Sequence, residues 1–284
     1  MNSDAVAYQG VPGAYGEQAA RDLVPEAGKL LAFPRFEDLF EAIHDGRARS
    51  GVVPIENTLA GSVHACYDLL GKYELVVVAE RVLRIAHALI APPGVALDSI
   101  RRVLSHPMAL LQCEKFFRRR RELEAVAVEN TAAAVKEIME SGRRDSAAIA
   151  SPRAAEIYGA SVLAADLEDD PTNFTRFLLI ARSQSDLERS DAGRALKTSL
   201  LFRTENRPAA LFEALRPFAE RSINLAKIES RPIRGSRFEY LFYLDAVVPA
   251  ERLEDLDAAV EALASRSTGL RRLGTYPAAE NGGA

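Results

Sequence analysis

The stretch NFTRFLLI, residues 173–180, places a hydroxyl and a fixed positive charge at the start of an apolar run. Its last four residues, FLLI, predict a buried strand. Arg176 is costly to desolvate unless an anion meets it. These residues alone leave two interpretations open. Either a carboxylate of the chain pairs with Arg176, or the anion is a substrate and Thr175 takes part in its chemistry.

A second group of polar residues follows a predicted strand in PIENTLAGSVHACYDLL, residues 54–70. We expect this strand to break at Pro54. The residues of this group that suit ligand binding are Glu56, Asn57, Thr58, Gly61 and Ser62. Donors and acceptors at the carboxyl end of a strand suit a pocket for a polyanionic small molecule. The alternative is that Ser62 only caps a helix.

Ser105 and His106 repeat this arrangement in SHPMAL, residues 105–110, where a strand is expected to end before a helix begins at Pro107. They are able to reach an anion, and helix capping explains them equally well. The four consecutive arginines in KFFRRRRELE predict a solvated face or an interface. No Ser/His/Asp order, Cys/His pair or phosphate loop stands out.

The length of 284 residues allows two or three domains, and 48% hydrophobic with 27% charged residues is typical of a globular protein. The net charge of -4 excludes a general attraction to nucleic acid or anionic membranes. The start, MNSDAVAYQGVPG, lacks the features of a secretory signal. Two cysteines and scattered histidines provide neither a disulfide framework nor metal-ligand spacing. We therefore expect a cytoplasmic protein whose chemistry needs no metal.

The first 182 residues alternate between strand-like and helix-like segments, which predicts α/β layers with a mainly parallel sheet. Predicted strands include AVAYQ, ELVVVAERVLRIAHALIAP and SAAIAS; predicted helices include GEQAARDLV, FEDLFEAIHDG, VHACYDLLGKY, TAAAVKEIMESG and PRAAEIYG. The polar run 183–194 predicts a linker. Beyond it the pattern is βαββαβ, which is the ferredoxin-like plan.

Five motifs in this order resemble prephenate dehydratase with a C-terminal ACT regulatory domain: VAYQGVPGAYGEQAA, PIENTLAGSVH, LSHPMALLQCE, NFTRF and INLAKIESRP. The sequences of several stretches resemble the branch of this family that also includes arogenate dehydratases. The resemblance implies a catalytic domain at 4–182 with two α/β lobes around a cleft, like type 2 periplasmic binding proteins. It also implies a linker at 183–194 and an ACT domain at 196–277.

The activity implied by this resemblance is the removal of carbon dioxide and water from prephenate, giving phenylpyruvate on the route to L-phenylalanine. The resemblance assigns the key catalytic role to Thr175, with electrostatic help or a positioning role because threonine is a poor acid. Arg176 is expected to clamp a substrate carboxylate. No cofactor is implied. The substrate-binding residues implied are Arg176, Phe177, Glu56, Asn57, Thr58, Gly61, Ser62, Ser105 and His106. The alternatives are an arogenate dehydratase and a non-catalytic amino-acid sensor.

The ACT domain implies L-phenylalanine as an effector and a homodimer or homotetramer. The effector-binding residues implied are Ala209, Leu211, Asn224, Leu225, Glu229 and Ser230. The chain departs from the family at Ala209 and Ser222, where glycine is common, and at Ala226, where threonine is common. A β-carbon at Ala209 is expected to narrow the ligand approach or forbid a positive φ. Pro217 is expected to kink or end the regulatory helix.

Overall fold

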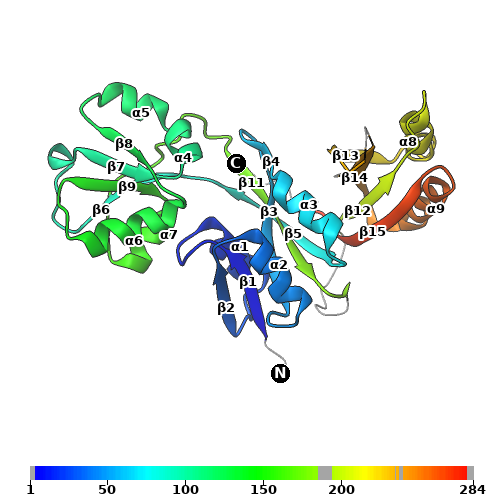
Figure 1. Cartoon of the computed structure of the whole chain (residues 1–284), viewed down its shortest axis with the longest axis horizontal. Helices are drawn as coiled ribbons and strands as arrows, with labels where there is room; N and C mark the ends of the chain where they lie inside the picture. Colours follow the sequence, from blue (N-terminus) through cyan, green and yellow to red (C-terminus); the bar gives the residue numbers. More distant parts are fainter. Residues whose placement is uncertain (1–3, 185–193, 234, 237–238, 280–284) are drawn as a thin grey trace. The chain divides into compact units, whose positions relative to one another are not determined.

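A computed structural model describes residues 4–184, 194–233, 235–236 and 239–279 (Figure 1). The chain divides into two compact units, one formed by residues 1–63 and 81–177 and the other by residues 64–80 and 178–284. Most of the predicted linker, residues 185–193, lies outside the described residues. In the described part of the chain, no helix is long and apolar enough to cross a membrane.

The first sheet has the strand order β2-β1-β3-β11-β5, with β4 paired to β3. Its strands are β1 (Ala5–Gln9), β2 (Lys29–Phe33), β3 (Ser50–Asn57), β4 (Gly61–Ser62), β5 (Val76–Arg84) and β11 (Phe174–Ala181). Helices α1 (Tyr15–Leu23) and α2 (Phe36–His44) pack against β1 and β3, and each buries one face of the helix. β1 pairs in parallel with β2 and β3.

The break predicted at Pro54 is wrong, because β3 continues through Pro54 to Asn57. The ladder between β1 and β3 ends at Val52. The missing N–H of Pro54 therefore costs no hydrogen bond on that side of the strand. As a result β3 stays regular to its end, where Glu56 and Asn57 lie.

The second sheet has the order β10-β6-β9-β7-β8. Its strands are β6 (Ala88–Ala91), β7 (Arg102–Ser105), β8 (Glu124–Ala127), β9 (Ser146–Ala150) and β10 (Ser161–Ala164). β7 is parallel to β8 and β9, whereas β6 is antiparallel to β9 and β10. The expectation of a mainly parallel sheet therefore needs correction, since this sheet is mixed.

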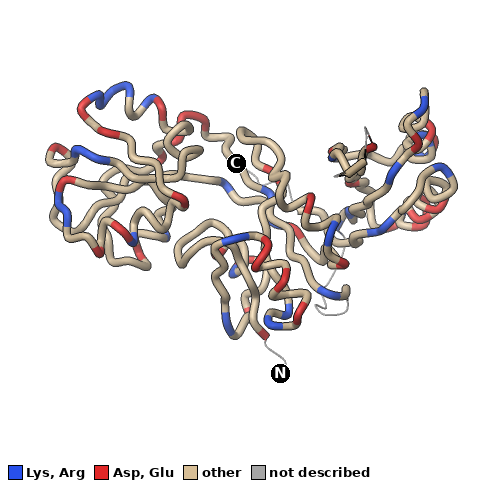
Figure 2. The backbone as a smooth tube through the Cα atoms, viewed as in Figure 1, with Lys and Arg blue, Asp and Glu red and all other residues tan. Residues whose placement is uncertain are grey.

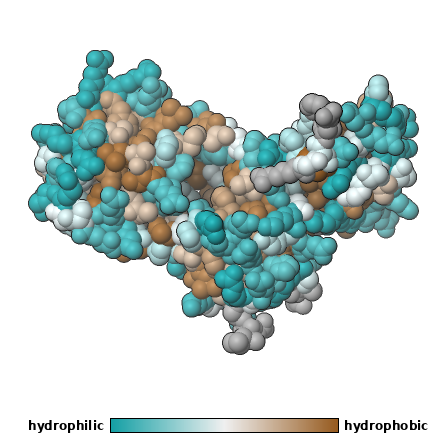
Figure 3. Space-filling view, viewed as in Figure 1, coloured by the Kyte–Doolittle hydropathy of each residue, from teal (hydrophilic) through white to brown (hydrophobic). Residues whose placement is uncertain are grey.

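Helices cover both faces of the second sheet. Helices α6 (Thr131–Ser141) and α7 (Pro152–Tyr158) share one apolar cluster with it. Helices α4 (Pro107–Gln112) and α5 (Glu114–Arg119) and the 3₁₀ turn η1 (Leu97–Ser99) share the other. In the space-filling view, hydrophobic surface gathers over the part of the first unit that carries these helices (Figure 3). The arginine run 118–121 at the end of α5 is exposed or half-buried in the chain, which fits the predicted solvated face or interface (Figure 2).

The second unit contains an antiparallel sheet of order β13-β14-β12-β15 with two helices packed on its apolar core. Its elements are β12 (Leu196–Arg203), α8 (Ala210–Glu220), β13 (Asn224–Pro232), β14 (Tyr240–Val248), η3 (Ala250–Arg252), α9 (Leu253–Ala264) and β15 (Thr268–Pro277). The predicted βαββαβ order is confirmed. The same unit includes α3 (His64–Lys72), whose Asp68 accepts two hydrogen bonds from Arg231 at 3.0 and 3.1 Å.

Two expectations for this unit are wrong in part. Pro217 lies inside α8 and does not end the helix, which continues to Glu220. A β-carbon at Ala209 does not forbid a positive φ, since φ is +64° there, and Ser222 also has a positive φ of +49°. An L-residue in this region costs about 1–2 kcal/mol. The backbone therefore keeps a conformation that favours glycine, with some strain.

Candidate active site

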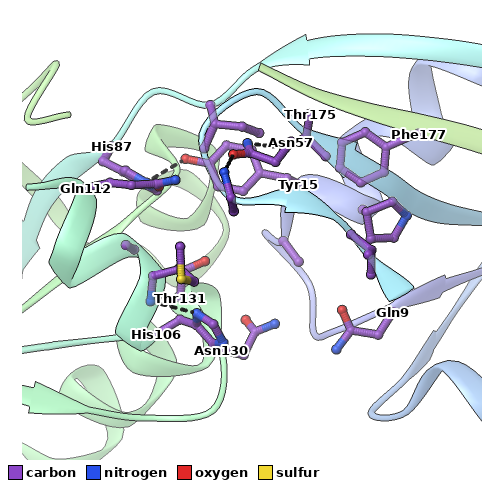
Figure 4. A pocket seen from close by; sticks show the side chains of 18 of the residues that line it. Gln9, Tyr15, Asn57, His87, His106, Gln112, Asn130, Thr131, Thr175 and Phe177 are labelled. Atoms are coloured by element: carbon purple, nitrogen blue, oxygen red, sulfur yellow. Dashed lines mark hydrogen bonds between the residues drawn. The ribbon is translucent and has the colours of Figure 1, made fainter. Parts of the chain in front are cut away.

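A cavity of about 410 Å³ lies in the first unit, within the usual size range of small-ligand pockets, about 300–1,000 Å³. It is lined by residues of the first sheet and of α1, by the segment that joins β5 to β6, and by α4 and the start of α6, which follow strands of the second sheet (Figure 4). Its polar lining residues are Gln9, Tyr15, Asn57, His87, His106, Gln112, Glu129, Asn130, Thr131 and Thr175. Glu129 is the only charged residue among the described lining residues, and none of them is a lysine or an arginine.

Thr175 lies one residue inside β11 and is buried, with its hydroxyl held by Asn57 at the end of β3. Asn57 Nδ2 donates to Thr175 Oγ1 at 2.9 Å and to Asn173 Oδ1 at 2.8 Å. The orientation of the Asn57 amide is fixed, because its Oδ1 accepts from the backbone N–H groups of Leu59 and Ala60. Thr175 Oγ1 is thus an acceptor toward Asn57. Its proton finds no acceptor among the described residues and is free to donate into the cavity.

The fixed Asn57 amide sets the polarity of a chain of hydrogen bonds that crosses to α4. Asn173 Oδ1 is an acceptor, so Asn173 Nδ2 is the donor to Gln112 Oε1 at 3.1 Å. Gln112 Oε1 also lies 3.0 Å from His87 Nε2. Because that oxygen is an acceptor, a proton on His87 Nε2 is required for this bond. Backbone N–H groups thereby dictate donor and acceptor roles from Thr175 to His87.

His106 and Asn130 place two helix N-termini at the cavity. His106 Nδ1 accepts from Met108 N at 3.2 Å at the start of α4, which leaves Nε2 as the protonated nitrogen. Burial lowers the pKa of His106, consistent with a neutral ring. Asn130 Oδ1 accepts from Ala132 N and Ala133 N at the start of α6. The cavity wall therefore offers neutral donors and helix dipoles to an anion.

The structure brings four of the predicted site residues to this cavity: Asn57, His106, Thr175 and Phe177. Arg176, by contrast, is 7% exposed, is absent from the lining and lies with Nη1 3.3 Å from Glu56 Oε1. This geometry matches the first of the two sequence interpretations, in which a carboxylate of the chain meets the arginine.

The remaining predicted substrate-binding residues lie outside the lining. Thr58 Oγ1 donates to Thr172 O at 2.6 Å. Gly61 and Ser62 form β4, with Gly61 at φ +79°. Ser105 is fully buried and donates to Ile149 O at 2.6 Å, so its hydroxyl is engaged inside the sheet.

Sequence reasoning missed several lining residues: Gln9, Tyr15, His87, Gln112, Glu129, Asn130 and Thr131. Two of them carried a usable signal. Gln9 ends a predicted strand, and Asn130 precedes a predicted helix as an N-cap. His87 lies within a long apolar stretch, where a lone histidine gives no indication of a site.

The predicted effector residues spread over different surfaces of the second unit. Leu211 lines a small cavity of about 170 Å³, and Ala209 immediately precedes α8. Asn224 and Ser230 are exposed on β13, whereas Leu225 packs against the core. Glu229 lies 3.3 Å from His64 Nε2 of α3, so it faces that helix rather than solvent.

Two family models match successive parts of the chain. Residues 6–185 match the family model for prephenate dehydratase, and residues 198–265 match the ACT domain model. The chain is 43% identical over 282 residues to "Arogenate dehydratase/prephenate dehydratase 2, chloroplastic" of Arabidopsis thaliana, covering 96% of this chain and 72% of that protein.

Two solved structures are similar over most of the chain. One is the prephenate dehydratase of Arthrobacter aurescens in complex with L-Phe, at TM-score 0.85 and 33% identity, covering 96% of this chain and 90% of that one. The other is GqqA, described as a novel type of quorum quenching acylase, at TM-score 0.83 and 34% identity, covering 96% and 98%.

Proposed function

Because the chain belongs to the prephenate dehydratase family and carries a C-terminal ACT domain, we propose that it converts prephenate to phenylpyruvate for L-phenylalanine biosynthesis. The observation that carries this proposal is the polarity of Thr175. Its oxygen accepts from Asn57, and its proton is left for a ligand in the cavity.

The reaction needs a proton donor at the leaving hydroxyl. The bond between the ring and its carboxylate breaks to release carbon dioxide, and that electron pair completes the aromatic ring as the carbon–oxygen bond to the hydroxyl breaks. One proton from solvent is consumed to turn hydroxide into water. Thr175 donates a hydrogen bond to the departing oxygen, while Asn57 Nδ2 stabilises the negative charge that develops on the threonine oxygen.

The test is turnover of prephenate by Thr175→Ala and Thr175→Ser. Removing the hydroxyl should lower kcat by about 10²–10⁴-fold, the usual worth of a positioned acid, with the fold intact by circular dichroism. Thr175→Ser keeps the hydroxyl and should retain much more activity. Equal activity in wild type and Thr175→Ala would refute the assigned role.

Arogenate is the second candidate substrate, and Glu129 is the observation that favours it. Arogenate carries an ammonium group where prephenate has a keto oxygen, and Glu129 is the only charged group in the described lining. An ammonium is able to pair with this carboxylate. Because Glu129 is exposed, Glu129→Gln should lower kcat/KM for arogenate by about 2- to 5-fold relative to prephenate. An unchanged ratio would remove this candidate's support.

An acylase activity like that of GqqA has less support. Acyl transfer needs an activated nucleophile with an adjacent base. In the described cavity the threonine hydroxyl is held by an amide donor, Asn57 Nδ2, rather than by a base.

We further propose that L-phenylalanine is the effector of the ACT domain and that the protein acts in the cytoplasm as a homodimer or homotetramer. The similarity to the Arthrobacter aurescens enzyme, which holds L-Phe, supports the choice of effector. Ser230→Ala should weaken the response to phenylalanine, while the buried Thr198→Val in β12 serves as a control for the stability of the same unit. Light scattering gives the oligomeric state.

A further inference from the structure

The cavity presents an electrostatic problem for the proposed substrate, and this inference rests on that proposed function. Prephenate carries two carboxylates. The described lining contains the carboxylate of Glu129 and no arginine or lysine, and Arg176 is turned to Glu56 instead. Neutral donors alone are a weak counterpart to a dianion in a partly buried site. A positive charge in the lining therefore requires a lining side chain that becomes protonated.

His87 is the lining residue whose surroundings fit such a role. It is 2% exposed and lies between β5 and β6, with Nδ1 3.2 Å from Tyr15 Oη and Nε2 3.0 Å from Gln112 Oε1. Tyr15 has one proton, and Tyr15 Oη donates to Ala86 O at 2.6 Å. The tyrosine oxygen is thus placed to accept a bond from His87, and the Gln112 oxygen is fixed as an acceptor by Asn173.

Counting protons shows that only the doubly protonated ring satisfies every contact. The neutral ring with hydrogen on Nε2 leaves Nδ1 facing the oxygen of Tyr15, unless Tyr15 gives up its bond to Ala86. The neutral ring with hydrogen on Nδ1 turns the bare Nε2 toward the Gln112 oxygen. The imidazolium donates at both nitrogens, to Tyr15 and to Gln112. An unmade bond at such a buried site leaves a polar atom without water or another partner, which is unfavourable.

One charged neighbour of His87, the carboxylate of Glu168, favours a proton on the ring. Glu168 is 9% exposed and accepts from the backbone N of His87 at 2.9 Å and from Arg84 at 2.7 Å. From α1 the ring faces Tyr15, and Cys113 follows Gln112 at the end of α4. Burial lowers the pKa of His87, against the raising effects of the Gln112 bond and the Glu168 charge. Burial raises the pKa of both Tyr15 and Cys113, so these two groups stay neutral.

We propose that His87 is a proton-dependent substrate-binding residue that is protonated when the dianionic substrate occupies the cavity. In the empty enzyme burial keeps the ring neutral, and its contact with Tyr15 is then left unmade. The ring takes one proton from solvent on binding and keeps it through the reaction. It is therefore separate from the proton consumed at the leaving hydroxyl. Its charge acts on the ligand across the lining and through the bond to Gln112.

The pH dependence follows from linkage. A bound dianion raises the pKa of His87, so binding is tightest below the pKa of the empty enzyme. Affinity is lost as pH rises from that pKa to the higher pKa of the complex. Over this window Kd should rise by about tenfold per pH unit. His44 and His64 lie on exposed surfaces and are not among the lining residues of the cavity.

The experiment is calorimetric binding of prephenate to the full-length Thr175→Ala protein, in which turnover is expected to be about 10²–10⁴-fold slower. Titrations at about pH 7.5, one unit above the ordinary histidine pKa, in buffers of different ionisation enthalpy give the number of protons taken up. We expect an uptake approaching one proton per site. His87→Gln in the same background should bind with little uptake and a nearly flat pH profile, because glutamine is able to donate to Gln112 but cannot become charged.

Matched variants assign the proton. His106→Gln and His44→Gln should keep the uptake, since neither ring is required by the proposal. Binding without proton uptake in Thr175→Ala would overturn it, and this measurement does not depend on whether the His87 variant folds. Uptake that persists in folded His87→Gln would overturn it as well. No binding together with no turnover by wild type would refute the proposed function, and this inference with it.

Discussion

Asn57→Asp tests the polarity of the site with almost no change of shape. One oxygen of the new side chain still accepts from the N–H groups of Leu59 and Ala60. The other replaces Asn57 Nδ2 and faces three oxygens, those of Asn173, Phe174 and Thr175, at 2.8–3.0 Å. The threonine proton then turns toward the new carboxylate. Thr175 becomes an acceptor on the side where the substrate needs a donor.

The magnitude follows from the hydrogen bonds that the substitution removes. Removing one donor that stabilises developing charge costs about 10²–10³-fold in kcat, or roughly 2.7–4 kcal/mol. The fold is weakened separately, because the buried Asn173 Oδ1 is left without its partner at a cost of about 1–3 kcal/mol. We therefore expect a soluble but less stable variant with kcat reduced by about 10²–10³-fold.

The assay is prephenate turnover across pH, with circular dichroism to confirm folding. Activity should recover in part as pH falls, because the introduced carboxyl group, once protonated, again has a hydrogen to donate. Asn57→Asp should add little in the Thr175→Ala background if the two residues act as one unit. A folded Asn57→Asp enzyme with kcat within about threefold of wild type would refute the donor assignment, given the 10²–10³-fold expected.

Three further perturbations test other parts of the structure. Ala209→Gly should raise the free energy of unfolding of the second unit by about 0.5–1 kcal/mol, because relief of the left-handed strain outweighs the greater entropy of glycine in the unfolded chain. Thermal unfolding measures this change, and a lower Tm would contradict the strain at Ala209. Arg176→Lys should lower the free energy of unfolding by about 1–3 kcal/mol, because it weakens the ion pair with Glu56, and it should leave KM nearly unchanged. A raised KM with unchanged stability would instead indicate that Arg176 clamps the substrate. Burial raises the pKa of Cys113 to about 12 and also raises the pKa of Cys66. Neither thiol should therefore react with a disulfide reagent at about pH 8 until the protein unfolds. Fast reaction of the native protein would contradict the burial of these thiols.

Much of the fold could be predicted from local patterns. The helices with a clear apolar face and an end signal, such as α2 and α6, lie where periodicity indicates, and Gly142 ends α6 at φ +66°. Strands β2 and β8 carried no such signal, because they lie at sheet edges and are only partly buried. The direction of β6 could not be predicted either, since it depends on which neighbours it pairs with and not on its own residues.

The site could be predicted only in part, because its hydrogen bonds join segments far apart in the chain. Asn57 and Thr175 each follow a strand pattern that indicates a binding edge, but their contact spans 118 positions. His87 and Gln112 gave no signal, since their roles depend on the fixed amide of Asn173. For Arg176 the sequence did give an indication, because a charge beside apolar residues needs an anionic partner. Only the structure identifies that partner as Glu56.

The decisive measurement is a pair of turnover assays with prephenate and arogenate, without added metal and with or without L-phenylalanine. We expect phenylpyruvate from prephenate, loss of that activity in Thr175→Ala, and a change in rate when phenylalanine is added. Turnover of arogenate alone would keep the site and change its substrate. Folded protein that converts neither compound would contradict the assignment as a dehydratase.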